Sequence, residues 1–370
     1  MTELLFNNSF SPLPTLFIIP SGIGCEIGGF AGDAIPCARL LSVASGLLIT
    51  HPNVLNGASL YWSDPRIQYV EGYGLDRFAA GEIALRKVTK QKIGLLVDAG
   101  IEPELIQRHL EVVNACRASL GIDVRLVVKT DVPLEINLRD GSSGTSWGIL
   151  RNPESLLNAG EKLKSSGVTA IAIVTRFPDE NSGESSAVDL YRRGQGVDSL
   201  AGAEAVISHL LVRHLSIPCA HAPALNPLPI SEDLDPRAAA EELSHTFLAC
   251  VLVGLSKAPN MVSLTKDLQL NDLTVNQLGA VVVPATALGG EALLACVERK
   301  IPVIGVENSS MLNVNAQALG IMNEQKQIKD FDYYPASNYL EAAGLILSLR
   351  EGIHRDSLYR PLKDISKGSL

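Results

Sequence analysis

Ala280-Val-Val-Val-Pro284, Gly289-Gly-Glu-Ala292 and Ile301-Pro-Val-Ile304 follow one another near the end of this 370-residue chain. The first and last strings are short apolar runs of strand length, and the stretch from Gly290 to Arg299 has helical spacing. A buried strand, a glycine loop, a helix and a second buried strand make a βαβ unit, which pairs its two strands in parallel. This part of the sequence therefore predicts an α/β fold.

The same order of elements occurs twice more, earlier in the chain. The second unit consists of Ala170-Ile-Ala-Ile-Val-Thr175, Gly202-Ala-Glu-Ala205 and Ile217-Pro-Cys-Ala220. The first and looser unit consists of Leu16-Phe-Ile-Ile-Pro20, Gly32-Asp-Ala34 and Leu47-Leu-Ile-Thr50. Three such units predict a mostly parallel sheet, or two such sheets, flanked by helices. Because βαβ units favour these patterns in any case, a common ancestor of the three stays an open question.

The length of the chain favours two domains. We expect an N-terminal α/β domain over 1–150, with an inserted strand and helices, and a C-terminal α/β domain over 151–370 that holds two of the units. A long helix is predicted over 235–256, with a largely apolar second half.

Composition excludes several classes of partner. The net charge is −9 and there is no dense run of Lys and Arg, which argues against nucleic acid and against an anionic membrane surface. No apolar run approaches the roughly 20 residues that span a bilayer, and Met1 to Phe10 lacks the pattern of a signal peptide. The six cysteines are dispersed without a CxxC pair, which predicts reduced thiols. We therefore expect a cytoplasmic protein.

The ends of the second strands carry the polar side chains of greatest interest. These are His51-Pro-Asn53, His221-Ala-Pro223 and Glu307-Asn308. Ligands of open α/β sheets bind beyond the carboxyl ends of the strands. His51 and His221 are therefore predicted as general base or acid, with histidines hydrogen-bonded inside their loops as the alternative. His209, His214 and His245 lie on predicted helices and are expected to be structural.

A carboxylate stands in the first helical turn of each unit, at Asp33, Glu204 and Glu291. Such a group satisfies the helix dipole and repels an incoming anion, so these glycine loops are poor phosphate cradles. Plain helix capping is one interpretation. The other is that Glu204 and Asp33, with Glu307, orient a substrate or share the proton transfer.

Further residues are predicted to bind the substrate. The serine-rich loop after Asp140 and the arginine pair in the long polar segment 176–199 offer groups for a carboxylate or phosphate. A flexible connector and a solvated arginine pair are the alternatives, and Asp198 has helix capping as its alternative role. The predicted binding residues are Gly28, Gly29, Asn53, Asn56, Ser142, Ser143, Arg192, Arg193, Asp198, Asn226, Gly289, Gly290 and Asn308.

Known cofactor motifs find little support. Gly22-Ile-Gly-Cys-Glu-Ile-Gly28 resembles a dinucleotide fingerprint with one residue too many, and His51 stands where the ribose-binding acid belongs. We expect neither nicotinamide nor flavin. Cys219 and His221 are two positions apart, and this pair alone is not specific for a metal site. A divalent metal is therefore a minor alternative.

Four strings resemble an uncharacterised conserved family of photosynthetic bacteria: Gly28-Gly-Phe-Ala-Gly-Asp-Ala34, Thr50-His-Pro-Asn53, Cys219-Ala-His-Ala-Pro223 and Tyr191-Arg-Arg-Gly-Gln-Gly-Val-Asp198. The resemblance implies no activity. From the residues we expect an enzyme acting on a small polar, anionic metabolite, as a hydrolase, isomerase or transferase. A non-catalytic metabolite sensor and a subunit of a homo-oligomeric assembly are the alternatives.

Overall fold

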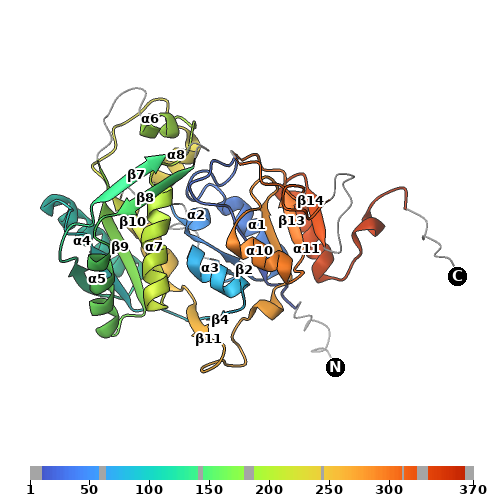
Figure 1. Ribbon diagram of the computed structural model, residues 1–370, viewed down its shortest axis with the longest axis horizontal. Coiled ribbons are helices and arrows are strands. Elements are labelled where there is room, and N and C mark those ends of the chain that lie inside the picture. The colour runs from blue at the N-terminus through green and yellow to red at the C-terminus, as the bar shows by residue number, and fades with distance from the viewer. Residues whose placement is uncertain are drawn as a thin grey trace.

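The computed structural model describes residues 11–57, 64–140, 145–178, 187–242, 246–310, 312–322 and 332–362. In these ranges the chain forms two parallel sheets flanked by helices, with two short antiparallel strand pairs (Figure 1). The predicted fold class, mostly parallel α/β, is confirmed.

The first sheet holds, within the described ranges, six strands in the order β14-β13-β12-β1-β2-β3, all paired in parallel. It combines strands from both ends of the chain. They are β1 (Thr15–Phe17), β2 (Leu48–Thr50), β3 (Ile67–Tyr69), β12 (Ala280–Pro284), β13 (Val303–Val306) and β14 (Tyr333–Ala336). The central strands β1 and β12 are buried along their whole length, as expected of a parallel sheet covered on both faces.

The second sheet has the order β10-β9-β5-β6 in the part of the chain that the structure describes, again all parallel. Its strands are β5 (Ile93–Val97), β6 (Val124–Lys129), β9 (Ala170–Arg176) and β10 (Cys219–Ala224). The fully buried strand β5 was not among the elements predicted from the sequence.

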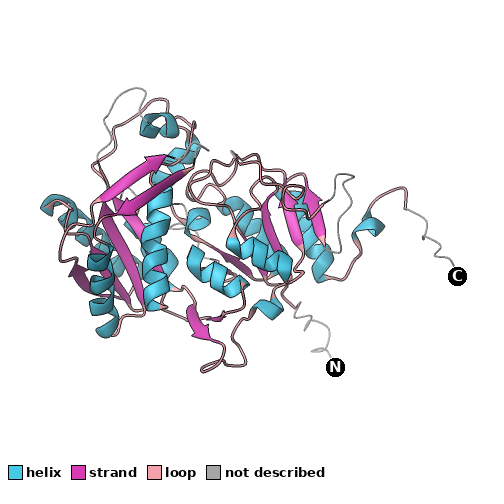
Figure 2. Ribbon diagram, in the orientation of Figure 1, coloured by secondary structure: helices cyan, strands magenta, loops and turns pink. Residues whose placement is uncertain are grey.

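The remaining elements cover the sheets. The helices are α1 (Ile35–Ser45), α2 (Pro52–Leu55), α3 (Gly72–Ala79), α4 (Pro103–Leu120), α5 (Pro153–Ser165), α6 (Ala187–Arg192), α7 (Ala201–Leu215), α8 (Pro236–Glu242), α9 (Leu248–Ser256), α10 (Glu291–Glu298) and α11 (Tyr339–Arg350). The antiparallel pairs join β4 (Ile83–Arg86) to β11 (Asn260–Ser263), and β7 (Ile136–Asp140) to β8 (Ser146–Leu150). The second of these pairs packs on α7 through β8 (Figure 2).

All three predicted βαβ units are present. They are β1-α1-β2, β9-α7-β10 and β12-α10-β13, and in each the two strands are parallel neighbours. Each sheet takes strands from both sides of residue 150, so the domain boundary expected there does not coincide with a boundary between the sheets.

The predicted helix over 235–256 is wrong as a single element. The described parts form α8 and α9, and Phe247 at the N-terminus of α9 has a φ of 58°. That left-handed conformation cannot continue an α-helical hydrogen-bond ladder. The interruption matters because the two halves pack differently. Helix α9 contacts strands β9 and β10 of the second sheet, and it contacts α2, which follows β2 of the first sheet. Helix α8 instead contacts α6.

The two sheets share one hydrophobic core. Phe17 and Leu48 of the first sheet, Leu95 and Ala172 of the second and Leu252 of α9 belong to the same buried cluster. Helices α3 and α7 also contact each other between the sheets. In Figure 1, α6 and α8 lie above the junction that these helices form.

Candidate functional site

Two adjoining pockets lie between the sheets, beyond the carboxyl ends of β2 and β10. We call the one that contains His51 and His209 the polar chamber, and the one that contains Leu225 and Phe247 the apolar chamber. Both are lined by Ala31, Asn56, Asp198, Glu204 and His221, so the two chambers adjoin.

His51 and His221, the two histidines predicted at strand ends, both line the polar chamber. His51 directly follows β2 of the first sheet, as predicted. The prediction for His221 is wrong, because β10 of the second sheet continues to Ala224 and His221 lies within it. The tertiary structure brings the two histidines together.

Two neighbours hold the His221 ring in place. Its Nε2 lies 2.5 Å from Oγ1 of the buried Thr175 on the neighbouring strand β9. The ring packs edge-on against Phe177, with centroids 5.5 Å apart. Its Nδ1 lies 3.4 Å from Oε1 of Glu204, yet forms no hydrogen bond although it is buried. A buried polar atom without a hydrogen bond is costly.

His51 is fixed in one tautomer. The backbone N–H of Ile19 donates to its Nε2 at 3.1 Å, so the ring proton of the neutral form resides on Nδ1. Burial, and secondarily the nearby His209, lowers the pKa of His51 to about 4. The ring is therefore a neutral N–H donor near pH 7.

His209, expected to be structural, lines the polar chamber together with Glu71. Its Nδ1 lies 2.5 Å from Oε1 of Glu71, which also caps α3 by accepting from the N–H of Tyr73. Burial lowers the pKa of His209, but the hydrogen bond and charge of Glu71, with Asp76, outweigh it and raise that pKa above the ordinary value. No sequence signal had linked Glu71 to His209, because they lie on different helices, 138 positions apart.

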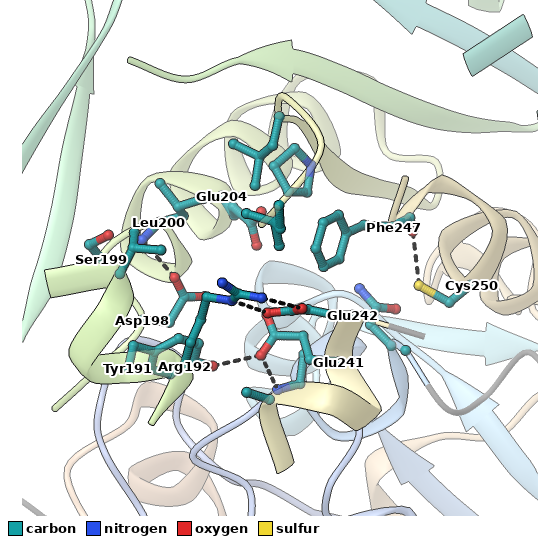
Figure 3. Close-up of a pocket in the computed structure, with 18 of the residues that line it drawn as sticks. Tyr191, Arg192, Asp198, Ser199, Leu200, Glu204, Glu241, Glu242, Phe247 and Cys250 are labelled. Atoms are coloured by element: carbon teal, nitrogen blue, oxygen red, sulfur yellow. Dashed lines mark hydrogen bonds and ion pairs between the residues drawn. The ribbon is translucent and has the colours of Figure 1, made fainter. Parts of the chain in front are cut away.

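Glu241 was also missed by the sequence. It accepts from Tyr191 Oη at 2.6 Å and from the N–H of Ala31 at 3.3 Å. Burial, together with the charges of Asp198 and Glu204, raises the pKa of Glu241 well above its ordinary range. Figure 3 shows Glu241 beside Glu242 and Arg192 on one side of the apolar chamber, facing Glu204.

The predicted arginine pair splits. Arg192 is buried and lines the apolar chamber, where its Nε donates to Glu242 at 2.8 Å and its Nη2 to the carbonyl of Pro229 at 2.7 Å. Arg193 is more exposed and pairs with Asp189 one turn earlier in the chain. Neither guanidinium is aimed at an open anion site.

Three more predicted residues border the site. Oδ1 of Asp198 accepts from the N–H of Leu200 at 2.8 Å, at the start of α7. Asn56 accepts from Tyr69 Oη at 2.9 Å, and Asn53 donates to the carbonyl of Gly28 at 3.1 Å. Asp198 and Asn56 line both chambers, and Asn53 lines the polar one.

Several predicted residues hold the first glycine loop together instead. Asp33 accepts from the N–H of Gly28, and Asn308 binds both the N–H and the carbonyl of Ile27. Burial raises the pKa of Asp33 to about 6. Five other predicted site residues lie away from both chambers. Gly29 lines a separate surface groove, and the exposed ones are Glu307, Asn226, Gly289 and Gly290. Ser142, Ser143 and His245 lie outside the described residues.

Among the residues that the structure describes, no three or more His, Cys, Asp or Glu side chains are grouped to hold a metal ion. Across the same ranges, no helix combines the length and the apolar character needed to cross a bilayer.

Comparison with known proteins places the chain in a family. A family model described as "Protein of unknown function (DUF3326)" matches residues 14–359, which include both chambers. The chain belongs to this family. An "Uncharacterized lipoprotein" of Synechococcus sp. is 48% identical over 342 residues, 92% of each chain. No solved structure matches the chain significantly. The predicted resemblance to an uncharacterised family of photosynthetic bacteria is thereby confirmed.

Proposed function

We propose that this protein is an enzyme that transfers protons on a small polar metabolite bound between the two sheets. One observation carries the proposal. His51 and His221, from strands of different sheets, line one chamber together with Glu204 and the His209–Glu71 pair. Acid–base chemistry needs such convergent titratable groups, whereas a binding protein is served by amides and backbone.

His221 supplies the base. Thr175 contacts Nε2, so Nδ1, which is buried and has no hydrogen bond, is the atom that takes the proton. Glu204 lies 3.4 Å from that atom, so its side chain moves aside when a substrate reaches Nδ1. A carboxylate beside the ring stabilises the imidazolium that forms when His221 takes a proton.

His51 and His209 supply donors of two kinds. His51 is neutral and presents Nδ1–H, which polarises a substrate oxygen without giving up its proton. The pKa of His209 is raised by Glu71, which favours the protonated ring that can donate to a substrate. Histidines whose pKa values are pushed apart are a common way to divide donor roles in one site.

The charges of the site favour a substrate with hydroxyl or amino groups. Glu71, Asp198 and Glu204 line the polar chamber, against the single raised-pKa histidine His209. The expected anion-binding role of Arg192 loses its support, because Glu242 and the Pro229 carbonyl already occupy that guanidinium. We therefore no longer favour an anionic metabolite.

A thermal-shift screen tests the proposal. The panel contains neutral polyols, amino alcohols, carboxylates and phosphates, and the proteins are wild type, His221→Gln and His214→Gln. His214 is on the same helix as Glu204 but pairs with Glu161 at the surface, so it is the matched control. A hit at about a hundred times its dissociation constant stabilises by roughly 2.7 kcal/mol. We expect this in wild type and His214→Gln, with the shift reduced in His221→Gln.

Turnover separates the enzyme from the sensor. Conversion of the hit, followed by NMR, should fall at least about 100-fold in His221→Gln. Binding without conversion in wild type would identify a sensor. Equal stabilisation of His221→Gln and wild type would remove His221 from the site.

We also propose a cytoplasmic location, supported by free cysteines at Cys25, Cys37, Cys116, Cys219, Cys250 and Cys296. The printed name of the Synechococcus relative, a lipoprotein, favours membrane anchorage instead. Fractionation of cells expressing the full-length protein decides between them: recovery in the membrane pellet, released by detergent but not by salt, would overturn the cytoplasmic location.

A further inference from the structure

The proposed proton transfer at His221 does not explain why the site has an apolar chamber. Its apolar lining comes from Val188 on α6, Ala238 on α8, Leu225 and Leu228 after β10, and Phe247 before α9. The space between its walls is about 770 Å³, much of it open to solvent, and the enclosed part is about 80 Å³, which suits a short hydrocarbon chain.

Two acidic groups of the apolar chamber, Glu241 and Glu242, are already paired. Glu241 accepts from Tyr191 and from the Ala31 N–H, and Glu242 is paired with Arg192. Burial keeps the pKa of Glu241 high, which favours its uncharged form. A hydrocarbon group that enters this chamber therefore does not desolvate Glu241 or Glu242 as unpaired charges. Burial of the hydrocarbon group there is favourable.

The apolar chamber adjoins the reacting groups. Glu204 and His221 line both chambers, and Figure 3 shows Glu204 and the Phe247 ring projecting into the same cavity. A ligand whose polar end meets His221 has its remaining atoms directed either into the polar chamber or along Phe247 and Leu228.

We propose that the apolar chamber binds the hydrocarbon chain of the substrate, whose hydroxyl or amino end lies at His221 and Glu204. The substrate class is thus an amphipathic alcohol or amine. This inference rests on the proposed function, and it adds a second subsite with its own specificity. Val188, Leu225, Leu228 and Phe247 select for chain length, while the histidines act on the polar end.

A homologous series of probes tests the inference. The series is 2-aminoethanol, 2-amino-1-butanol and 2-amino-1-hexanol, titrated calorimetrically into the full-length protein. Burial of each added CH₂ is expected to tighten binding about three- to fourfold. The heat-capacity change should become more negative with chain length, as burial of apolar surface requires.

Two tryptophan variants locate the chain. Leu228→Trp narrows the apolar chamber and should remove the dependence on chain length. Leu340→Trp adds the same ring to a side chain 73% exposed on α11 and should keep that dependence. If Leu228→Trp fails to fold, the affinity series and heat-capacity change of wild type still decide the question.

The outcomes separate the two proposals. If 2-aminoethanol binds wild type and longer chains bind no tighter, the apolar subsite is overturned and the proposed function stands. Chain-length dependence that survives in Leu228→Trp would also overturn the subsite, because the chain then binds elsewhere. In His221→Gln the whole series should weaken with its chain-length dependence kept. Failure of every probe, 2-aminoethanol included, would contradict both the polar subsite and the apolar one.

Discussion

Nδ1 of His221 lies 3.4 Å from Oε1 of Glu204, buried and without a hydrogen bond. Glu204 also adds to the repulsion that raises the pKa of Glu241, together with burial and Asp198. The site thus keeps an unsatisfied ring nitrogen and a crowd of carboxylates in the folded protein. Such arrangements reduce stability and are retained where function needs them.

Glu204→Gln should therefore stabilise the free protein while impairing its activity. At pH 8 we expect the free energy of unfolding to rise by roughly 0.5–1 kcal/mol, because one of the repelling charges is gone. Urea unfolding measures it. Glu154→Gln is the matched control, since Glu154 is also a first-turn carboxylate, exposed on α5, and should lose a few tenths of a kcal/mol. A destabilised Glu204→Gln would contradict the repulsion argument.

Arg192→Gln should be strongly destabilising and Arg193→Gln nearly neutral. Arg192 is 6% exposed and holds Glu242 through paired hydrogen bonds, so its removal leaves a carboxylate without a partner in a partly buried place. We expect a loss of about 2–3 kcal/mol. Arg193 follows α6 and is exposed, although its partner Asp189 is partly buried, and its loss should stay within about 0.5 kcal/mol. Similar effects in both variants, by chemical denaturation, would refute the assignment.

Gly28→Ala should destabilise the first glycine loop. Gly28 has a φ of 88°, and a Cβ there would run into the side chain of Ile19. We expect a loss of roughly 2–4 kcal/mol from the combined strain and overlap. Gly289→Ala is the control, because Gly289 has no left-handed φ and a Cβ there would make only an ordinary contact with Val314, so its effect should be under about 0.5 kcal/mol. Equal thermal midpoints for the two variants would count against the loop geometry.

The ring of His51 should stay neutral well below pH 6, with its proton on Nδ1. Long-range ¹H–¹⁵N correlation spectra of histidine-labelled protein report both the tautomer and the charge. Because the pKa of His51 is lowered to about 4, the unfolded state binds a proton that the folded state does not between about pH 6.5 and 4. Stability contributed by this group falls as the pH drops through that window. Protonation of His51 near pH 6.5 would disprove the burial argument.

Asp33→Asn should gain stability relative to wild type as the pH rises. Burial raises the pKa of Asp33 to about 6, so the folded state holds its proton at pH values where the unfolded chain has lost it. The stability that protonated Asp33 contributes to the wild type is fully present below about pH 3.8, and it is lost as the pH rises through 6. The difference between Asp33→Asn and wild type should shift by about 2 kcal/mol over that range. Asp356→Asn, at an exposed position, should show no comparable shift.

The sequence by itself determined the repeating units. Apolar runs such as Ala280–Pro284, separated by glycine loops and helical periodicity, are local patterns that few alternative structures satisfy. They placed His51 correctly after its strand, but they ended the strand of His221 at Ala220, whereas β10 continues to Ala224. Periodicity misled the prediction where the backbone of a single residue interrupts a helix. Phe247 ends the apparent helix over 235–256 by its left-handed backbone, which no periodicity reveals.

Only the tertiary structure decided which strand ends meet. In the first sheet β13 is separated from β2 by β12 and β1, so the Glu307-Asn308 tip lies away from His51, and Asn308 binds the glycine loop at Ile27. In the second sheet β10 is an edge strand among the described strands. Helix α9 contacts both β10 and α2, the helix that follows His51. His221 therefore joins His51. The order of strands and the packing of sheets depend on many weak contacts between residues far apart in the chain, and no local pattern records their sum.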